Sequence, residues 1–155
     1  DHGIGLDPAR GADQAQDEAL VQELFGRMAA NAADFTLTFR RLADAVEGRE
    51  EGVRALFADP AAYDGWAEGW RARLARDPRS AAERATAMRG INPAVIPRNH
   101  LVEEALSAAT EREDLAPFEA LLAEIRRPFE ERPEGDRVTL PPQESERVRA
   151  TFCGT

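Results

Sequence analysis

The sequence predicts an all-α protein, a compact orthogonal bundle of about six helices with an extended, proline-rich C-terminal tail. Apolar side chains recur at helical spacing along most of the 155 residues. Helix start and stop signals separate these stretches by only a few residues, with no convincing strand pair and no internal repeat. Short helices joined by short loops fit an orthogonal bundle better than a long four-helix bundle.

Each of the first helices is predicted from one apolar stripe. Over residues 17–30 the stripe defines a single buried face, made of Leu20, Val21, Leu24, Phe25 and Met28. Asn31 marks a break. The second stripe, which Gly48 closes as a natural C′ residue, consists of Phe35, Phe39, Leu42 and Val46. A short helical piece with Val53, Leu56 and Phe57 follows.

The next helices are predicted from their start signals. Asp59 can accept from free backbone N–H groups, and Pro60 stands where no N–H is needed. The stripe of this helix is Tyr63, Trp66, Trp70 and Leu74, before Asp77-Pro78 closes it. Residues 80–83 read S-A-A-E, a capping box that starts a helix ending at Gly90.

The remaining helices are predicted from prolines and caps. Asn92-Pro93 predicts another start, which Pro97 interrupts before a helix over Arg98–Ala109. The buried face of that helix is predicted at Leu101, Val102, Ala105 and Leu106. Asp114 is expected to cap a last helix, ended by Pro128, with an inner face of Leu115, Phe118, Leu121, Leu122 and Ile125.

These elements divide the chain into three parts. Residues 1–16 are polar and glycine-rich, and we expect a flexible lead-in or a truncated end. Residues 17–128 form the helical domain. Residues 129–155 form an extended tail that ends in a cysteine, because Pro133, Pro141 and Pro142 break any helix.

Composition excludes several classes of function. The net charge of -9 disfavours polyanions, so we expect neither nucleic acid nor a membrane as a partner. No apolar run approaches the ~20 residues that cross a bilayer, and residues 1–13 do not resemble a signal peptide. All 20 basic residues are arginine, which excludes lysine-dependent mechanisms and, with the many alanines, suggests a bacterial gene. We expect a cytoplasmic protein.

Several candidate sites have simpler structural interpretations. His100 and Glu104 share a helix face but lack a third ligand, so a surface pair is favoured over a metal site. Three aromatic residues at helical spacing are more consistent with a core stripe than with a platform for stacking a base: Tyr63, Trp66 and Trp70. Acidic residues that are adjacent in sequence point in different directions on a helix, so the pairs Glu103-Glu104 and Glu130-Glu131 indicate solvated faces. A glycine-rich phosphate loop follows a strand, and no strand is predicted before Gly3, Gly5 and Gly11. The residues therefore predict no catalytic group and no metal ligand in this chain.

Cys153 is the single cysteine and lies two residues before the end. It cannot form a disulfide within the chain. An exposed terminal position and the small neighbour Gly154 favour a redox thiol, although only Arg149 lies near it in sequence to lower its pKa. The alternative is a thiol that is merely tolerated at an exposed end.

Six short segments occur in an order that indicates a relationship. They are Asp34–Arg40 (D-F-T-L-T-F-R), Trp66 with Trp70–Leu74 (W-R-A-R-L), Met88–Pro93 (M-R-G-I-N-P) with Arg98-Asn99, Arg127–Phe129, Pro141-Pro142 and Thr151–Thr155 (T-F-C-G-T). From about residue 17 to the end, the chain thus resembles the C-terminal third of the selenoprotein O family. Pro97 departs from the family pattern, in which an aliphatic residue is usual before the Arg-Asn pair, and this puts the helix start there in doubt.

The resemblance implies a larger enzyme. Members of the family have a protein-kinase-like fold without the usual catalytic aspartate and bind ATP in an inverted orientation with Mg2+ or Mn2+. They transfer AMP to Ser, Thr or Tyr hydroxyls of protein substrates. Their phosphate-binding lysine, its glutamate partner and their metal-binding acids lie upstream of the matched region, so the resemblance places no ATP site here. It implies that the kinase-like domain of the same protein is a partner, and that this chain alone is inactive.

The resemblance also bears on individual residues. Cys153 matches the C-terminal cysteine of the family, which is selenocysteine in vertebrate members, and a redox role with a cysteine outside this chain is implied. Asp34, Arg40, Arg98 and Asn99 are interpreted as structural polar anchors, with Asp34 a candidate carboxylate partner for either arginine. The competing hypotheses are a non-catalytic helical protein-interaction module and, with less support, a metal-dependent helical hydrolase.

Overall fold

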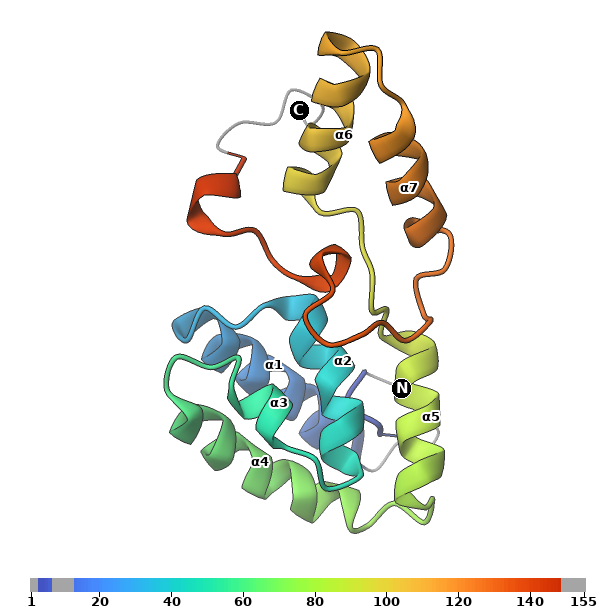
Figure 1. Ribbon diagram of the computed structural model, residues 1–155. Helices are drawn as coiled ribbons and strands as arrows, with labels where there is room; N and C mark the ends of the chain where they lie inside the picture. Colours follow the sequence, from blue (N-terminus) through green and yellow to red (C-terminus); the bar gives the residue numbers. More distant parts are fainter. Residues whose placement is uncertain (1–2, 7–12, 149–155) are drawn as a thin grey trace. The chain divides into compact units, whose positions relative to one another are not determined.

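The computed structural model describes residues 3–6 and 13–148 (Figure 1). Over these ranges it contains seven α-helices and no β-strand, which confirms the predicted all-α fold. The chain divides into two units, residues 1–93 and residues 94–155. The predicted boundaries after residues 16 and 128 differ from this division and stay predictions.

Unit 1 contains five helices. They are α1 (Gln14–Ala30), α2 (Phe35–Val46), α3 (Glu51–Arg54), α4 (Pro60–Leu74) and α5 (Ala81–Ile91). Helix α1 packs along α4, α2 packs along α5, and α3 contacts both α2 and α4 (Figure 1). Each of the five corresponds to a helical stretch predicted from the sequence.

The two tryptophans of α4 lie at the centre of unit 1. Trp66 and Trp70 are each 1% exposed and stack with their ring centroids 5.1 Å apart. The Trp66 Nε1–H donates to the Leu20 carbonyl and the Trp70 Nε1–H donates to the Ile4 carbonyl, both at 2.9 Å. Because a buried indole N–H requires an acceptor, these bonds tie α4 to α1 and to residues 3–6. The aromatic stripe is core, as predicted.

Residues 3–6 require a correction to the predicted lead-in. Ile4 and Leu6 are fully buried in the core of unit 1, and α1 begins at Gln14. Gly5 has φ +81°, and a Cβ there would lie 2.8 Å from the sulfur of Met88. Only glycine adopts this conformation at so close an approach without strain. Two apolar residues in a segment this short leave no periodic signal, which explains the missed prediction.

Local sequence signals set the helix ends in unit 1. Helix α2 ends in a Schellman motif, in which the N–H groups of Gly48 and Arg49 donate to the carbonyls of Ala45 and Asp44, both at 3.0 Å. The predicted capping box of α5 is present, since the Ser80 side chain accepts from the Glu83 N–H and the Glu83 carboxylate accepts from the Ser80 N–H. These predictions are confirmed because both motifs depend only on neighbouring residues.

The predicted helix start at Asn92-Pro93 is wrong. Residues 92–98 contain no helix, and Asn92 has extended backbone angles of φ -94° and ψ 110°. Its side-chain amide donates to the Gly3 carbonyl at 2.7 Å instead of serving as a cap. Pro97 also disfavours the helical conformation at the preceding residue. A long-range bond and a proline together override the local start signal.

Unit 2 contains the helices α6 (Asn99–Glu111) and α7 (Ala116–Ile125), which pack against each other. Two short 3-10 helices follow, η2 (Arg137–Thr139) and η3 (Glu144–Glu146). The N–H groups of Ala94 and Val95 both donate to the Pro128 carbonyl, at 2.7 and 3.2 Å, and so close the base of the α6–α7 hairpin. The part of the predicted tail up to residue 148 is thus attached to the helices by specific contacts, such as that of Arg98 with the Thr139 carbonyl.

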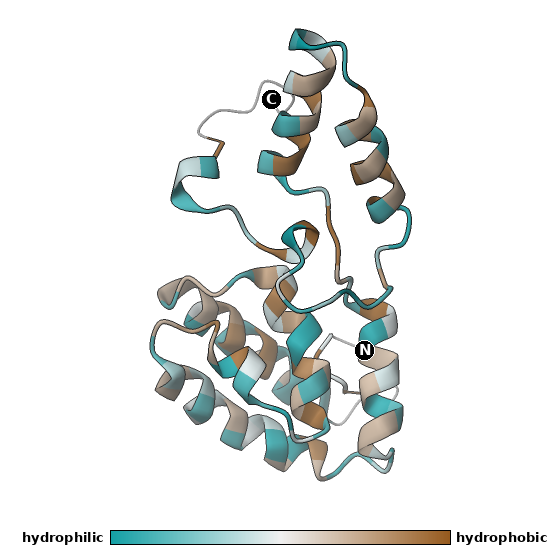
Figure 2. Cartoon of the chain, in the orientation of Figure 1, coloured by the Kyte–Doolittle hydropathy of each residue, from teal (hydrophilic) through white to brown (hydrophobic). Residues whose placement is uncertain are grey.

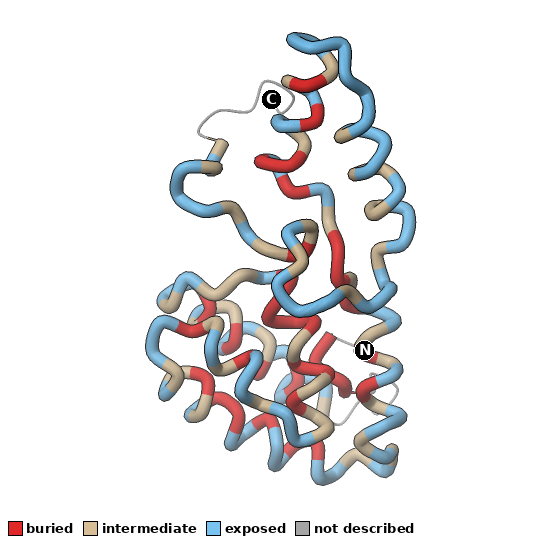
Figure 3. The backbone as a smooth tube through the Cα atoms, viewed as in Figure 1, coloured by how far each residue is buried: buried red, intermediate tan, exposed pale blue. Residues whose placement is uncertain are grey.

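The inner face predicted for α7 is not fully buried, although Leu121, Leu122 and Ile125 are half-buried against α6. No residue of α7 is buried, and Phe118 is 44% exposed, while Leu115 just before the helix is 56% exposed. In Figure 3 the tube of α7 carries no buried segment, whereas α6 does. On α6, Leu101 and Ala105 are buried as predicted, but Leu106 is 42% exposed. Amphipathic spacing marks which side chains share a face and leaves open whether anything covers that face.

In the described ranges, no helix is both long enough and apolar enough to span a bilayer.

Candidate functional site

Cys153 lies outside the described residues, so its redox role stays a prediction. The other residues selected from the sequence lie in two places. Asp34 and Arg40 belong to unit 1, and Arg98 and Asn99 lie at the start of α6 in unit 2.

Arg40 links α2 to the end of α5. It is 8% exposed, and its Nη1 donates to the Arg89 and Asn92 carbonyls, each at 2.8 Å. The last carbonyls of a helix lack intrahelical partners and carry partial negative charge, so a guanidinium is a strong C-terminal cap. This geometry gives Arg40 a structural role.

Asp34 is the N-cap of α2. Its side chain accepts from the Leu37 N–H at 3.0 Å, and its own backbone is extended. The cap accounts for the aspartate at the start of the D-F-T-L-T-F-R segment. Its predicted pairing with Arg40 or Arg98 stays a prediction.

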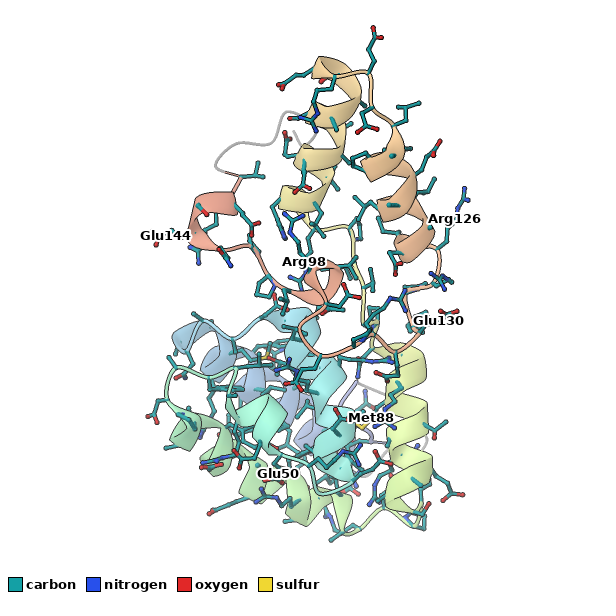
Figure 4. The ribbon with its side chains drawn as sticks, viewed as in Figure 1. Glu50, Met88, Arg98, Arg126, Glu130 and Glu144 are labelled. Atoms are coloured by element: carbon teal, nitrogen blue, oxygen red, sulfur yellow. The ribbon has the colours of Figure 1, made fainter. Side chains whose placement is uncertain are left out.

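Arg98 and Asn99 begin α6 in different environments. Arg98 is 8% exposed, and its Nη2 donates to the Thr139 carbonyl at 3.0 Å (Figure 4). This bond holds η2 against the start of α6. Asn99 is exposed, and its interpretation as a structural polar anchor stays a prediction. The first residue of a helix that begins at the surface projects into solvent, and sequence alone did not define that geometry.

The environment of His100 differs from the prediction. The His100–Glu104 pair was interpreted as an ordinary surface pair, yet His100 is 94% buried while Glu104 is exposed. Burial lowers the pKa of the imidazole; Glu146 and Glu104 raise it, while Arg137 and Arg98 also lower it. Burial is the largest of these effects, so the net result is a lowered pKa that disfavours the protonated imidazole. Its Nδ1 has no hydrogen-bond partner within the described residues.

A small open cavity adjoins His100. Its volume is about 410 Å³, and it is lined by Ile96, Pro97, Arg98, Asn99, His100, Pro142, Arg147 and Val148. Four of these side chains can donate to a small polar molecule: Arg98, Asn99, His100 and Arg147. The cavity contains no carboxylate or thiol among its lining residues, so it has no evident acid–base pair or nucleophile for catalysis.

Arg137 organises the neighbouring surface. It donates to both carboxylate oxygens of Glu104, at 3.1 and 2.6 Å, and to Glu146 at 3.0 Å. The hydrogen bond from Arg137 lowers the pKa of Glu104. The Glu104 carboxylate is thus engaged, through Arg137, in fixing η2 and η3 to α6.

A buried ion pair in unit 1 escaped sequence analysis. Asp17 and Arg73 have side chains only 2% and 3% exposed, and their two hydrogen bonds measure 2.7 and 3.1 Å. The pair joins α1 to α4. The only local signal was a polar residue at helical spacing from Leu20 and Leu24, because the partner lies 56 positions away. Its enclosure between two helices indicates a structural role.

The described residues contain no metal centre. No three of their His, Cys, Asp and Glu side chains are grouped closely enough to hold an ion. Together, the buried arginines, caps and ion pairs of the described residues define a helical scaffold.

Comparison with known proteins identifies the scaffold. The model of the family described as protein adenylyltransferase SelO matches residues 3–126. This chain belongs to that family. The match confirms the resemblance to selenoprotein O.

Bacterial relatives share most of the chain. The protein nucleotidyltransferase YdiU of Bradyrhizobium sp. (strain BTAi1) is 55% identical over 140 residues, which is 90% of this chain and 28% of the relative. YdiU of Rhodopseudomonas palustris (strain BisB5) is 54% identical over 92% of this chain and 29% of its own length. YdiU of Methylorubrum extorquens (strain PA1) is 52% identical over 90% and 30%, respectively. The chain therefore spans less than a third of the length of these relatives.

Proposed function

We propose that this chain is the C-terminal helical part of a longer protein adenylyltransferase. The longer protein transfers AMP from ATP to Ser, Thr or Tyr hydroxyls of other proteins, with Mg2+ or Mn2+. The observation that carries the proposal is identity of 52–55% to protein nucleotidyltransferases over nine-tenths of the chain. Membership of the adenylyltransferase family supports AMP as the transferred group.

The ATP site lies in the kinase-like domain upstream in the longer protein. The absence of lysine from the sequence supports this location, because kinase-like sites hold the ATP phosphates with a lysine. The part described here acts as a buttress whose buried arginines fix the helices. The longer protein acts in the bacterial cytoplasm.

The terminal thiol regulates the enzyme in this proposal. An external two-electron oxidant, such as a small-molecule disulfide, would take two electrons and two protons from the thiols of Cys153 and of a cysteine in the kinase-like domain. The disulfide that forms between them would control access to the ATP site. The chain has no second cysteine, so the partner thiol belongs to another part of the longer protein.

A non-catalytic interaction module is the second candidate function. The exposed apolar side chains of α6 and α7 favour it, since such surfaces commonly bind proteins. It differs from the first candidate in requiring no nucleotide at any stage.

Calorimetry with a non-hydrolysable ATP analogue and Mn2+ tests the first candidate. We expect one binding site on the longer gene product and none on the 155-residue chain. Transfer of labelled AMP to a protein mixture should likewise require the longer protein. Binding of the analogue by the chain alone would contradict the location of the ATP site, and a longer protein that neither binds nor transfers would favour the interaction module.

A further inference from the structure

The most apolar helix of unit 2 is also the least buried. Helix α7 carries Phe118, Leu121, Leu122 and Ile125 within ten residues, yet none of its residues is buried. Phe118 is 44% exposed, and the next three are half-buried: Leu121, Leu122 and Ile125. One exposed apolar residue is ordinary, but a set of incompletely buried apolar residues on one face indicates a binding surface. The lack of burial therefore concerns the whole of α7 and not a single side chain.

These side chains line a groove between α6 and α7. The groove has a volume of about 90 Å³, and every residue that lines it is apolar: Val102, Ala105, Leu106, Phe118, Leu121, Leu122 and Ile125. Figure 2 shows hydrophobic residues on both helices of the hairpin. Hydrophobic burial contributes in proportion to the apolar area removed from water, so this face gains free energy from any apolar partner that fits it.

The charge around the groove restricts the partner. Between residues 99 and 125 the sequence has seven acidic residues and one basic residue, Arg112. Glu103, Glu111, Glu113 and Glu119 are exposed on the hairpin. Opposite potentials across an interface favour association and like charges oppose it. The groove therefore fits an apolar segment flanked by Arg or Lys.

We propose that the α6–α7 groove is the docking surface for the part of the longer protein that lies outside this chain. The inference rests on the proposed function, which makes the chain one part of that protein. The chain accounts for only 28–30% of its YdiU relatives, so more than two-thirds of each relative lies elsewhere. A segment in the same polypeptide meets the groove at a high effective concentration, which makes even a small apolar contact effective.

A second copy of the chain fits the groove less well. A symmetric dimer through this face would place the acidic hairpin of one copy against the acidic hairpin of the other. Repulsion between the acidic residues of the two copies would oppose such a contact. A segment of different composition within the longer protein has no such restriction.

Hydrogen exchange tests the docking directly. Amides of residues 116–125 are compared in the 155-residue chain and in the longer protein, at concentrations where sedimentation shows both to be monomers. We expect exchange in the longer protein to be slower by on the order of tenfold or more, because docking suppresses local opening. Equal exchange rates would overturn the inference.

Substitutions locate the protected surface. Leu106→Glu and Phe118→Glu place a charge in the groove, and Leu115→Glu is the matched control, since it lies outside the groove lining and is more exposed. In the chain alone, all three variants should unfold at the temperature of the parent. In the longer protein, the two groove variants should unfold several degrees lower than the control. Equal melting temperatures for the groove variants and the control would overturn the inference.

The proposed function and the docking can be tested independently of each other. AMP transfer by the longer protein is measured in the same preparations. Transfer with an unprotected groove retains the function and refutes the docking. A protected groove in a longer protein that transfers no AMP supports docking between its parts and refutes the proposed function.

Discussion

Buried arginines do much of the structural work at the level of single residues. Arg40 binds two carbonyls at the end of α5, Arg73 pairs with Asp17, and Arg98 binds the Thr139 carbonyl. A guanidinium presents several fixed donors, so one side chain can satisfy several acceptors that burial has removed from water. The all-arginine composition thus has a structural consequence beyond the exclusion of lysine chemistry.

Asp34 provides a prediction that separates capping from charge pairing. Asp34→Ala removes the acceptor for the Leu37 N–H and should lower the free energy of unfolding by about 1 kcal/mol. Asp34→Asn retains a capping oxygen, and asparagine is as good an N-cap as aspartate. If the cap is the main role of the residue, urea denaturation should give the Asn variant nearly parental stability.

The same pair of variants tests the predicted ionic partner. If the Asp34 carboxylate also neutralises a buried arginine, Asp34→Asn should be as destabilising as Asp34→Ala, or more so. The cost of leaving a buried charge without its partner exceeds that of a lost cap. Equal losses for the two variants would therefore support the ionic role inferred from the sequence.

At the level of elements, backbone conformation decides where helices end. Gly48 follows α2 with φ +89°, and no atom lies within 4 Å of a Cβ built there. Gly90 lies within α5 at a similarly open position, but with ordinary helical geometry. The two glycines differ in backbone conformation and not in available space.

This difference predicts substitutions of opposite sign. Gly48→Ala should lower the free energy of unfolding by about 1 kcal/mol, because a Cβ is disfavoured in the left-handed region. Gly90→Ala should raise it by up to about 1 kcal/mol, because alanine loses less conformational entropy in a helix. Thermal denaturation of the two variants provides the comparison. A stabilised Gly48→Ala protein would contradict the role assigned to the Schellman motif.

Two helix starts predicted from local sequence signals are confirmed. Helices α4 and α5 have predicted start signals, Asp59-Pro60 and the Ser80 capping box, which the structure contains. The start predicted at Asn92 failed because its side-chain amide binds Gly3, 89 positions earlier. Capping depends on residues within one turn, whereas competition for a capping side chain depends on the whole fold.

Across the whole molecule, burial is unevenly divided between the units. The hydrophobic core cluster of the described residues lies within residues 4–88, in unit 1. In unit 2 the buried apolar residues are Ala94, Val95, Leu101, Ala105 and Ala108. Large side chains contribute most to hydrophobic stabilisation, so the described part of unit 2 gains less from it than unit 1 does.

The stability of the whole chain should fall in acid. Hydrogen bonds from arginines lower the pKa of several carboxylates, including Glu47, Asp64 and Glu104. The largest shift is at Asp77, where the side-chain hydrogen bond from Arg79 lowers the pKa from 3.8 to about 2. A carboxylate whose pKa is depressed in the folded state contributes stability above its unfolded pKa and loses it as the pH falls.

Asp77→Asn tests this dependence. The ionised Asp77 should contribute about 2 kcal/mol at neutral pH, and this contribution should disappear between about pH 4 and pH 2. Urea denaturation should therefore show parent and variant differing at pH 6 and converging near pH 2. Glu68→Gln, at an exposed position of α4, is the control. A constant difference between parent and Asp77→Asn across this range would contradict the assignment.

The sequence by itself determined the helical class, the ends of most helices and the family, because each depends on local patterns or ordered motifs. Only the tertiary structure decided that Ile4 and Leu6 belong to the core and that Asp17 meets Arg73. It also decided that α7 has no buried residue. Periodicity identifies an apolar face within one helix, but its burial depends on which distant segment covers it, and that follows from packing along the entire chain.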